Sequence, residues 1–98
     1  GETGMIKVLI ERHIMPGLEQ DYEQASREVV REATHVPGFI SGENLMETGR
    51  AGHRILITSW RDARAWQEWS VSPARDRMMA RLAPMLSQPE RIILLEHT

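Results

Sequence analysis

Residues 54–73 read RILITSWRDARAWQEWSVSP, and they join a strand to two helix starts. The first seven residues form a run rich in β-branched side chains, which is typical of a strand. Asp62 then offers an N-cap for a short helix, and the Ser72-Pro73 pair restarts a helix, because proline is well tolerated at a first helical position. The stretch therefore predicts a strand followed by a helix that is broken in two.

Towards the N-terminus the pattern is a strand and then a helix. Residues 6–14, IKVLIERHI, alternate at period two and predict a strand that ends at the Pro-Gly pair of residues 16–17. From Leu18 the apolar residues recur every three or four positions, which predicts an amphipathic helix. The Val-Pro-Gly sequence at 36–38 ends this helix, because a residue that precedes proline is pushed out of the helical region.

The remaining segments complete a recognisable order of elements. Two extended runs, 39–47 and 54–60, are joined as a hairpin by a glycine-bounded loop at 48–52. In the broken helix Pro84 marks a kink or an early end, and RIILLE at 91–96 is the last strand. The order β-α-β-β-α-β predicts a ferredoxin-like α+β fold, in which a four-stranded antiparallel sheet has strand order 4-1-3-2.

Helices can cover only one face of such a sheet, so the apolar pattern assigns the two faces. The apolar residues expected under the helices are Ile6, Val8, Ile10, Ile55, Ile57, Ile93 and Leu95. Those expected on the open face are Leu9, Leu56, Trp60, Ile92 and Leu94. An open face that is half apolar usually meets a partner, so we expect a homodimer in which two sheets pack together and Trp60 is a dimer contact.

Length and composition narrow the class of protein. The chain has 98 residues, a net charge of −2 and no cysteine, which predicts one domain over residues 5–98 and a reducing cytoplasmic setting. The opening GETG reads as an expression-tag remnant before Met5, and neither a secretory signal nor a membrane span is expected. The weak negative charge argues against nucleic acid and anionic membranes as partners.

Several of these stretches resemble the antibiotic biosynthesis monooxygenase (ABM) domain family. The resemblance rests on IKVLIERHIMPG, VPGFISGENL, ILITSWRDARAWQEWSVSPARDRM and the final apolar strand. It implies a dimeric α+β barrel with a pocket in each subunit between the sheet and the broken second helix. The family includes cofactor-free oxygenases of polyketide phenols, haem-degrading oxygenases and enzymes acting on small signalling ketones, so the likeness implies the fold more closely than the reaction.

The residue pattern of the haem-degrading branch of the family can be compared with this sequence. The resemblance places an Asn on the first strand, a Trp in the short helix and a haem-ligating His about three turns beyond that Trp. Trp69 matches the Trp, but the Asn position falls on Ile10 or Glu11, and residues 75–82, RDRMMARL, contain no His. We therefore expect no haem and no other cofactor.

Cofactor-free oxidation needs an apolar slot and a polar group that handles a proton. Trp66 and Trp69 lie three apart on one helix face and could form the floor of a slot for an aromatic ring. Trp69 matches the pocket tryptophan of the family, whereas Trp66 and Tyr22 have core packing as their alternative. These three residues are the substrate-binding candidates.

Two charged residues are the catalytic candidates. Arg12 lies among isoleucines, where it is costly unless it is paired or faces a cavity, although an arginine at a strand end can also reach solvent. Glu43 faces the helices if the hairpin loop has five residues, whereas a two-residue loop replaces it by Asn44. The four histidines, at positions 13, 35, 53 and 97, show no paired spacing, so we interpret them as surface or interface residues and expect no metal site.

These features favour a small dimeric monooxygenase, without metal or organic cofactor, that acts on an aromatic or quinol-like compound. The alternative is a non-catalytic dimeric barrel that binds a small metabolite. A charged side chain that points into an apolar slot would favour the enzyme.

Overall fold

A computed structural model describes residues 4–98, and its elements follow the predicted order. The chain folds as β1 (Ile6–His13), α1 (Glu19–Ala33), β2 (Phe39–Glu47), β3 (Arg50–Trp60), α2 (Ala63–Ser70), α3 (Pro73–Leu82), a 3-10 turn (Ala83–Met85) and β4 (Arg91–Glu96). The break in the second helix is confirmed. Asp62 caps α2 by accepting a hydrogen bond from the backbone N–H of Ala65 at 2.8 Å, and Ser72 caps α3 through Arg75 N–H at 3.2 Å.

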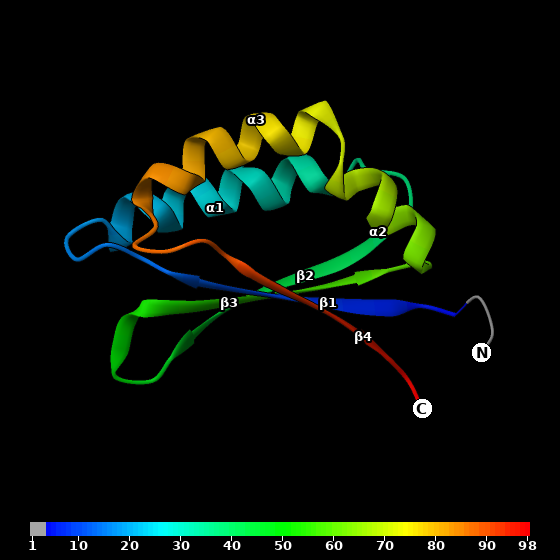
Figure 1. The fold of residues 1–98 in the computed structure, drawn as a ribbon, viewed down its shortest axis with the longest axis horizontal. Coiled ribbons are helices and arrows are strands. Elements are labelled where there is room, and N and C mark those ends of the chain that lie inside the picture. The colour runs from blue at the N-terminus through cyan, green and yellow to red at the C-terminus, as the bar shows by residue number, and fades with distance from the viewer. Residues whose placement is uncertain (1–3) are drawn as a thin grey trace.

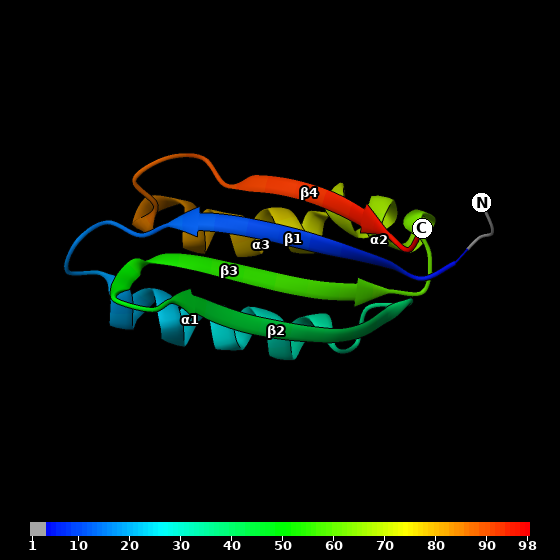
Figure 2. The ribbon, with the colours of Figure 1, turned by 90° about the horizontal axis from the view of Figure 1, so that it is seen from below.

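The four strands form one antiparallel sheet in the order β2-β3-β1-β4, which is the predicted ferredoxin-like arrangement read from the other edge. The helices lie together on one face of this sheet (Figure 1). Seen from below, the opposite face of all four strands carries no helix (Figure 2). Within residues 4–98, no helix is both long enough and apolar enough to cross a membrane.

The register shows that β3 and β4 present to the helices the face opposite to the one that the sequence predicted. Residues directly opposite each other in an antiparallel pair share a face, and Ile6, Val8 and Ile10 of β1 are buried under the helices as predicted. Their partners on β3 are Trp60, Thr58 and Leu56, and on β4 the partners of Ile10 and Val8 are Ile92 and Leu94. The predicted faces of β3 and β4 are therefore wrong.

The physical reason for this error is that β3 and β4 are apolar on both faces. Ile55 and Ile57 alternate with Leu56 and Thr58, and RIILLE is apolar at four consecutive positions, so period-two patterning does not distinguish the faces. On the open face the apolar side chains are instead Leu9, Leu45, Ile55, Ile57, Ile93 and Leu95.

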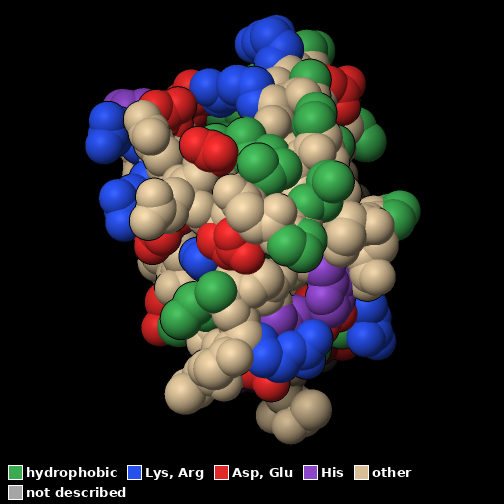
Figure 3. Space-filling model, turned by 90° about the vertical axis from the view of Figure 1, so that its left-hand side faces the viewer, with side chains coloured by type: hydrophobic (Ala, Val, Ile, Leu, Met, Phe, Trp, Pro, Cys, Tyr) green, Lys and Arg blue, Asp and Glu red, His purple; other side chains and the backbone are tan. Residues whose placement is uncertain are grey.

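The β2–β3 hairpin has a two-residue turn, Thr48-Gly49, in place of the predicted loop at 48–52. Gly49 has φ = +84°, a conformation that glycine adopts without steric cost. The register shifts between Met46 and Glu47, and beyond this irregularity Asn44 pairs with Leu56 and faces the helices, whereas Glu43 pairs with Ile57 on the open face. Histidine side chains lie among acidic and basic ones at the end of the molecule that carries this hairpin (Figure 3).

The three tryptophans meet in one core cluster beneath the helices. Trp60 is 1% exposed and donates its indole N–H to Thr58 Oγ1 at 2.9 Å. It packs edge-on against Trp66, with ring centroids 5.7 Å apart, and stacks with Trp69 at 6.5 Å. The prediction that Trp60 is a dimer contact is therefore wrong, because the register of β3 directs it into the core.

Candidate active site

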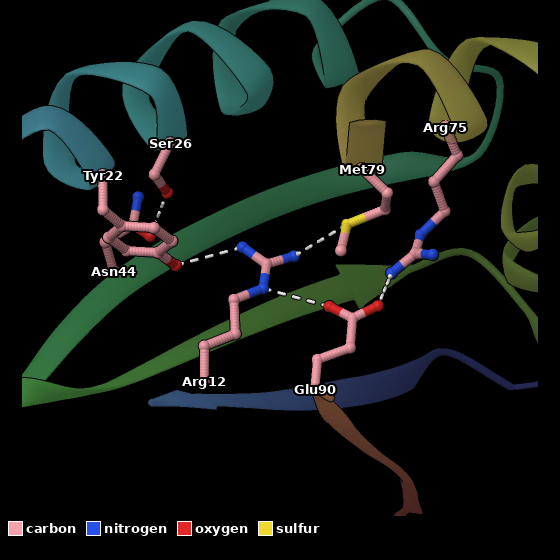
Figure 4. Close-up of polar contacts among 7 residues, drawn as sticks. All are labelled: Arg12, Tyr22, Ser26, Asn44, Arg75, Met79 and Glu90. Carbon is pink, nitrogen blue, oxygen red and sulfur yellow. Dashed lines mark hydrogen bonds and ion pairs between the residues drawn. The ribbon is translucent and has the colours of Figure 1, made fainter. Parts of the chain in front are cut away.

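Arg12 lies on the helix-covered face of β1 and is 2% exposed, so the alternative that it reaches solvent is wrong. Its guanidinium donates to Tyr22 Oη at 3.0 Å, to Glu90 Oε1 at 3.0 Å and to Met79 Sδ at 3.7 Å. These partners come from α1, from the segment before β4 and from α3 (Figure 4). A buried charge is tolerated when it is paired and hydrogen-bonded, and Arg12 is both.

Glu90 bridges two arginines. Its Oε1 accepts from Arg12 Nε, and its Oε2 accepts from Arg75 Nη2 at 2.7 Å (Figure 4). Burial by itself would raise the pKa of Glu90, but the hydrogen bond from Arg75 and the charges of both arginines outweigh it and hold that pKa below its usual value. The cluster therefore contains two cations and one anion, which leaves one net positive charge beneath the helices.

Tyr22 connects this cluster to the polar residues between α1 and the β2–β3 hairpin. It is 3% exposed, its hydroxyl accepts from Arg12, and the guanidinium of Arg54 lies 5.9 Å from its ring centroid. One turn along α1, Ser26 Oγ donates to Asn44 Oδ1 at 3.1 Å. A chain of polar side chains thus runs across the interior from β2 to the start of β4 (Figure 4).

A narrow slot lies between Arg12 and the tryptophan cluster. Its walls include Trp60, Trp66, Trp69 and Met79, and Arg12 and Arg75 are its charged residues. The cavity volume is about 30 Å³, which is enough for a water molecule. The slot therefore combines aromatic walls with a cationic end, although the side chains fill most of the space.

A second, open pocket of about 400 Å³ lies between α1 and the β2–β3 hairpin. It is lined by Tyr22, Ser26, Asn44, Met46 and Arg54, together with three neighbouring residues. Tyr22 lines this pocket and Arg12 lines the slot, so the hydrogen bond between them joins the two spaces.

The structure brings together four of the five predicted site residues. Arg12 and Tyr22 are hydrogen-bonded, and Trp66 and Trp69 line the same slot as Arg12. Glu43 lies apart from them, because it pairs with Ile57 and that side of β3 belongs to the open face, so the prediction that it faces the helices is wrong. Asn44, the alternative candidate, faces the helices instead, because it pairs with Leu56 on the side of β3 that the helices cover.

Sequence reasoning missed Glu90 and Arg75. Glu90 precedes the last strand in a segment without periodicity, and Arg75 is one of several arginines in the second helix. The signal that could have found Glu90 is Arg12 itself, because a buried arginine requires an acidic partner. The distance of 78 residues along the chain concealed which acid it was.

Comparison with known proteins gives the family. Residues 5–81 match the family model described as antibiotic biosynthesis monooxygenase. The chain belongs to this family. No curated protein sequence matches the chain.

Solved structures with the same fold agree with this membership. A crystal structure of an antibiotic biosynthesis monooxygenase is 18% identical, with a TM-score of 0.85 and coverage of 95% of this chain and 98% of that one. A mutant of SnoaB, a cofactor-independent oxygenase from Streptomyces nogalater, is 15% identical, with a TM-score of 0.85 and coverage of 95% and 92%. Rv0793 from Mycobacterium tuberculosis is 16% identical, with a TM-score of 0.84 and coverage of 97% and 96%. At these identities the likeness shows the ABM fold.

Proposed function

We propose that this ABM-family protein is a cofactor-independent monooxygenase that oxidises a small phenolic or quinol-like compound. The observation that carries the proposal is the placement of Arg12, a buried cation hydrogen-bonded to the hydroxyl of Tyr22, at the end of a slot walled by Trp66 and Trp69. Membership of the ABM family and the likeness to a cofactor-independent oxygenase support the same class of reaction.

The slot, together with Tyr22 behind Arg12, suits a substrate that becomes an anion. The net positive charge of the Arg12–Glu90–Arg75 cluster favours the phenolate form of a bound phenol over the neutral form. The Tyr22 hydroxyl accepts a hydrogen bond from Arg12, so its own proton is free to be donated to an oxygen of the substrate. The indole faces hold the flat ring.

The reaction balances without a cofactor because the substrate supplies all the electrons. A phenolate transfers an electron to dioxygen, and the resulting pair combines to form a carbon–oxygen bond at the ring carbon opposite the phenolic oxygen. The oxygen–oxygen bond then breaks. The ring loses its hydrogen at that carbon together with the phenolic proton, the product is a quinone, and the second oxygen atom leaves as water.

The slot must widen to admit such a ring. A cavity of about 150 Å³ binds benzene, whereas the slot measures about 30 Å³. Met78 and Met79 line it from α3, and their unbranched side chains adopt new rotamers easily. We expect these two methionines to move when a substrate enters.

The protein is further proposed to act as a homodimer through the open face of the sheet. Leu9, Ile55, Ile57, Ile93 and Leu95 form an apolar surface on that face, and a second copy of the same sheet would cover it.

The test is turnover under labelled oxygen. Polyketide phenols that carry a hydrogen on the ring carbon opposite the hydroxyl, and that raise the melting temperature of the protein, are incubated with it under ¹⁸O₂, and the products are analysed by mass spectrometry. We expect one ¹⁸O atom in the quinone product. Tyr22→Phe should lower kcat about 100-fold, as expected for the loss of a group that transfers a proton, while the protein stays folded.

A matched pair of variants locates the reaction. Met79→Phe narrows the slot, whereas Met46→Phe narrows the open pocket between α1 and the hairpin. We expect the first variant to lose turnover and the second to retain it. The reverse result would move the substrate to the open pocket.

A binding role without catalysis is the second candidate, and the open pocket favours it. At about 400 Å³ the pocket already has the size of a small-molecule site, and Tyr22, Asn44 and Arg54 give it polar groups. Saturable binding of a phenol without oxygen uptake, together with loss of that binding in Met46→Phe, would support this role over the monooxygenase.

A further inference from the structure

Two histidines and a glutamate meet on the open face of the sheet, on the opposite side from the slot. His13 of β1 and His53 of β3 are directly opposite each other in the register, and their rings stack with centroids 4.8 Å apart. Glu11 lies two residues before His13 and therefore on the same face of β1. Each of the three residues offers a ligand atom, and these atoms lie within 4.8 Å of one another.

The hydrogen bonds of His53 hold its ring in a defined orientation. Its Nδ1 lies 2.7 Å from Glu47 Oε1, and its Nε2 lies 2.7 Å from Glu11 Oε2. Glu47 itself accepts a hydrogen bond from Arg50 at 3.1 Å, which fixes that carboxylate. A carboxylate on the far nitrogen of an imidazole is the arrangement that orients metal-binding histidines, because it fixes the tautomer and turns the other nitrogen towards the ion.

We propose that Glu11, His13 and His53 bind one divalent transition-metal ion of the Zn²⁺ type, with Glu47 as the residue that orients His53. Two imidazoles and one carboxylate are a known ligand set for zinc, in which a water molecule takes the fourth position. A metal would replace the proton now shared between Glu11 and His53. The two ligand atoms would then separate from 2.7 Å to about 3.3 Å, the spacing that tetrahedral ligands at about 2.0 Å require.

The ligand types determine which metal ions the site prefers. Imidazole suits Zn²⁺, Cu²⁺ and Ni²⁺, whereas Mg²⁺ and Ca²⁺ prefer sites made entirely of oxygen. In the single chain His13, His53 and Glu11 are each half-buried, and His13 and His53 lie at the end of the open face, so an ion can enter from solvent at that end while the strands hold the ligands in place. Side-chain rotation is sufficient for binding, because directly opposite residues of two strands have Cβ atoms about 5 Å apart.

This site is independent of the proposed monooxygenase reaction. Its ligands lie on the open face, whereas Arg12 and the tryptophans lie beneath the helices. Histidine side chains gather with charged ones at the end of the molecule where β1 ends and the β2–β3 hairpin turns (Figure 3). Loss of metal binding and loss of oxygenation are therefore separate results.

The experiment is calorimetric titration of the full chain with ZnCl₂ at pH 8, where protons compete least with the metal. We expect saturation at one ion per chain. His53→Gln and His13→Gln should each abolish this binding, and Glu47→Gln should weaken it about 10- to 100-fold, as is typical for a residue that orients a ligand. His35→Gln is the matched control, because His35 lies in the turn after α1, and it should bind as the wild type does.

Binding of Co²⁺ gives a second measurement, which distinguishes metal binding from a purely structural role of the cluster. Co²⁺ bound by two imidazoles and a carboxylate should show visible absorption that Zn²⁺ displaces and that both His13→Gln and His53→Gln lack. Far-UV circular dichroism checks that each variant is folded, and Zn²⁺ titration of the wild type stands even if one variant is not. Absence of saturation in the wild type, or binding by both His13→Gln and His53→Gln that equals that of the wild type, would show that the cluster is only an ion-pair network between three strands.

Discussion

At the scale of single residues, the polar interior depends on Arg12 and its acidic partner. Arg12 is 2% exposed and the Glu90 side chain is 13% exposed, so neither charge is fully solvated. Removing one member of a buried pair leaves the other uncompensated, which costs more than the pair contributes to stability. Glu90 accordingly has a structural role, and in the proposed function it also sets the charge at the end of the slot.

Glu90→Gln should destabilise the protein at pH 7 by about 3 kcal/mol, at the lower end of the range for buried pairs because Glu90 is partly exposed. The pKa of Glu90 is held below its usual value of 4.5, so the stability that its charge provides is fully present above pH 4.5. This stability is lost as the pH falls through the pKa of the folded protein. The difference between wild type and variant, measured by urea unfolding, should therefore shrink between pH 5 and pH 3.

The control is Glu23→Gln, which breaks an exposed pair with Arg27 on α1. Exposed i,i+4 pairs contribute about 0.3–0.5 kcal/mol, so this variant should stay close to the wild type. A difference for Glu90→Gln that persists unchanged at pH 3 would contradict the assignment of a charged Glu90.

The second prediction for a single residue concerns the stability that Trp60 contributes, because Trp60 is the most buried of the three tryptophans. Trp60→Ala should cost about 3–5 kcal/mol, the usual range for a buried aromatic, since it removes the contacts with Phe39, Trp66 and Trp69. Val71→Ala, at a position that is 78% exposed, should change stability by less than about 0.5 kcal/mol. Urea unfolding measures both, and a Trp60→Ala variant as stable as Val71→Ala would contradict the register of β3.

At the scale of elements, the turn between α1 and β2 packs tightly against α2. Gly38 has φ = +86°, and a Cβ at this position would collide with the Cβ of Ala65. The backbone carbonyl of Gly38 also accepts a hydrogen bond from Arg61 N–H at 2.8 Å, which ties the turn to the end of β3. Glycine is needed here both for its backbone conformation and for the close approach.

Two glycine-to-alanine substitutions separate these causes. Gly49 has nearly the same φ, +84°, but a methyl group on its Cα would meet no other part of the described chain within 4 Å, so Gly49→Ala should cost only the backbone strain of about 1–2 kcal/mol. Gly38→Ala should cost at least about 1 kcal/mol more, because overpacking adds to the same strain. Chemical unfolding of the two variants gives the comparison. Equal losses of stability would show that α2 is not held against this turn.

At the scale of the whole molecule, the proposed dimer depends on the open sheet face. If two copies pack through it, a charge at its centre must prevent association. Ile57 pairs with Leu9 on this face, so Ile57→Lys should convert a dimer into a folded monomer, as measured by light scattering at micromolar concentration. The wild type should also melt at a temperature that rises with protein concentration.

Val71→Lys is the matched control for this test, because Val71 is exposed at the break between α2 and α3. It should leave the dimer intact. A wild-type protein that is monomeric at micromolar concentration would refute the proposed dimer without affecting the oxygenase proposal for the slot.

The order of the elements, and most of their ends apart from the β2–β3 hairpin, could be predicted from the sequence. Local signals carried this information: the alternation of IKVLIERHI, the helical spacing from Leu18 and the caps Asp62 and Ser72. The sequence also identified Arg12, Tyr22, Trp66 and Trp69 as site candidates, because a charge among isoleucines and aromatics on one helix face are visible without a structure. These signals act over a few residues, so one sequence is sufficient to read them.

Three features became visible only in the folded chain. These are which side of β3 and β4 lies under the helices, which acid pairs with Arg12, and the contact between His13 and His53. Strands that are apolar on both sides have no period-two signal that separates their faces, so pairing with β1 sends Trp60 into the core and Glu43 to the open face. Glu90 reaches Arg12 across 78 positions, and His53 reaches His13 across 40, through strand pairing. Contacts of this kind arise from the way the whole sheet packs, because each depends on a register that no single strand specifies.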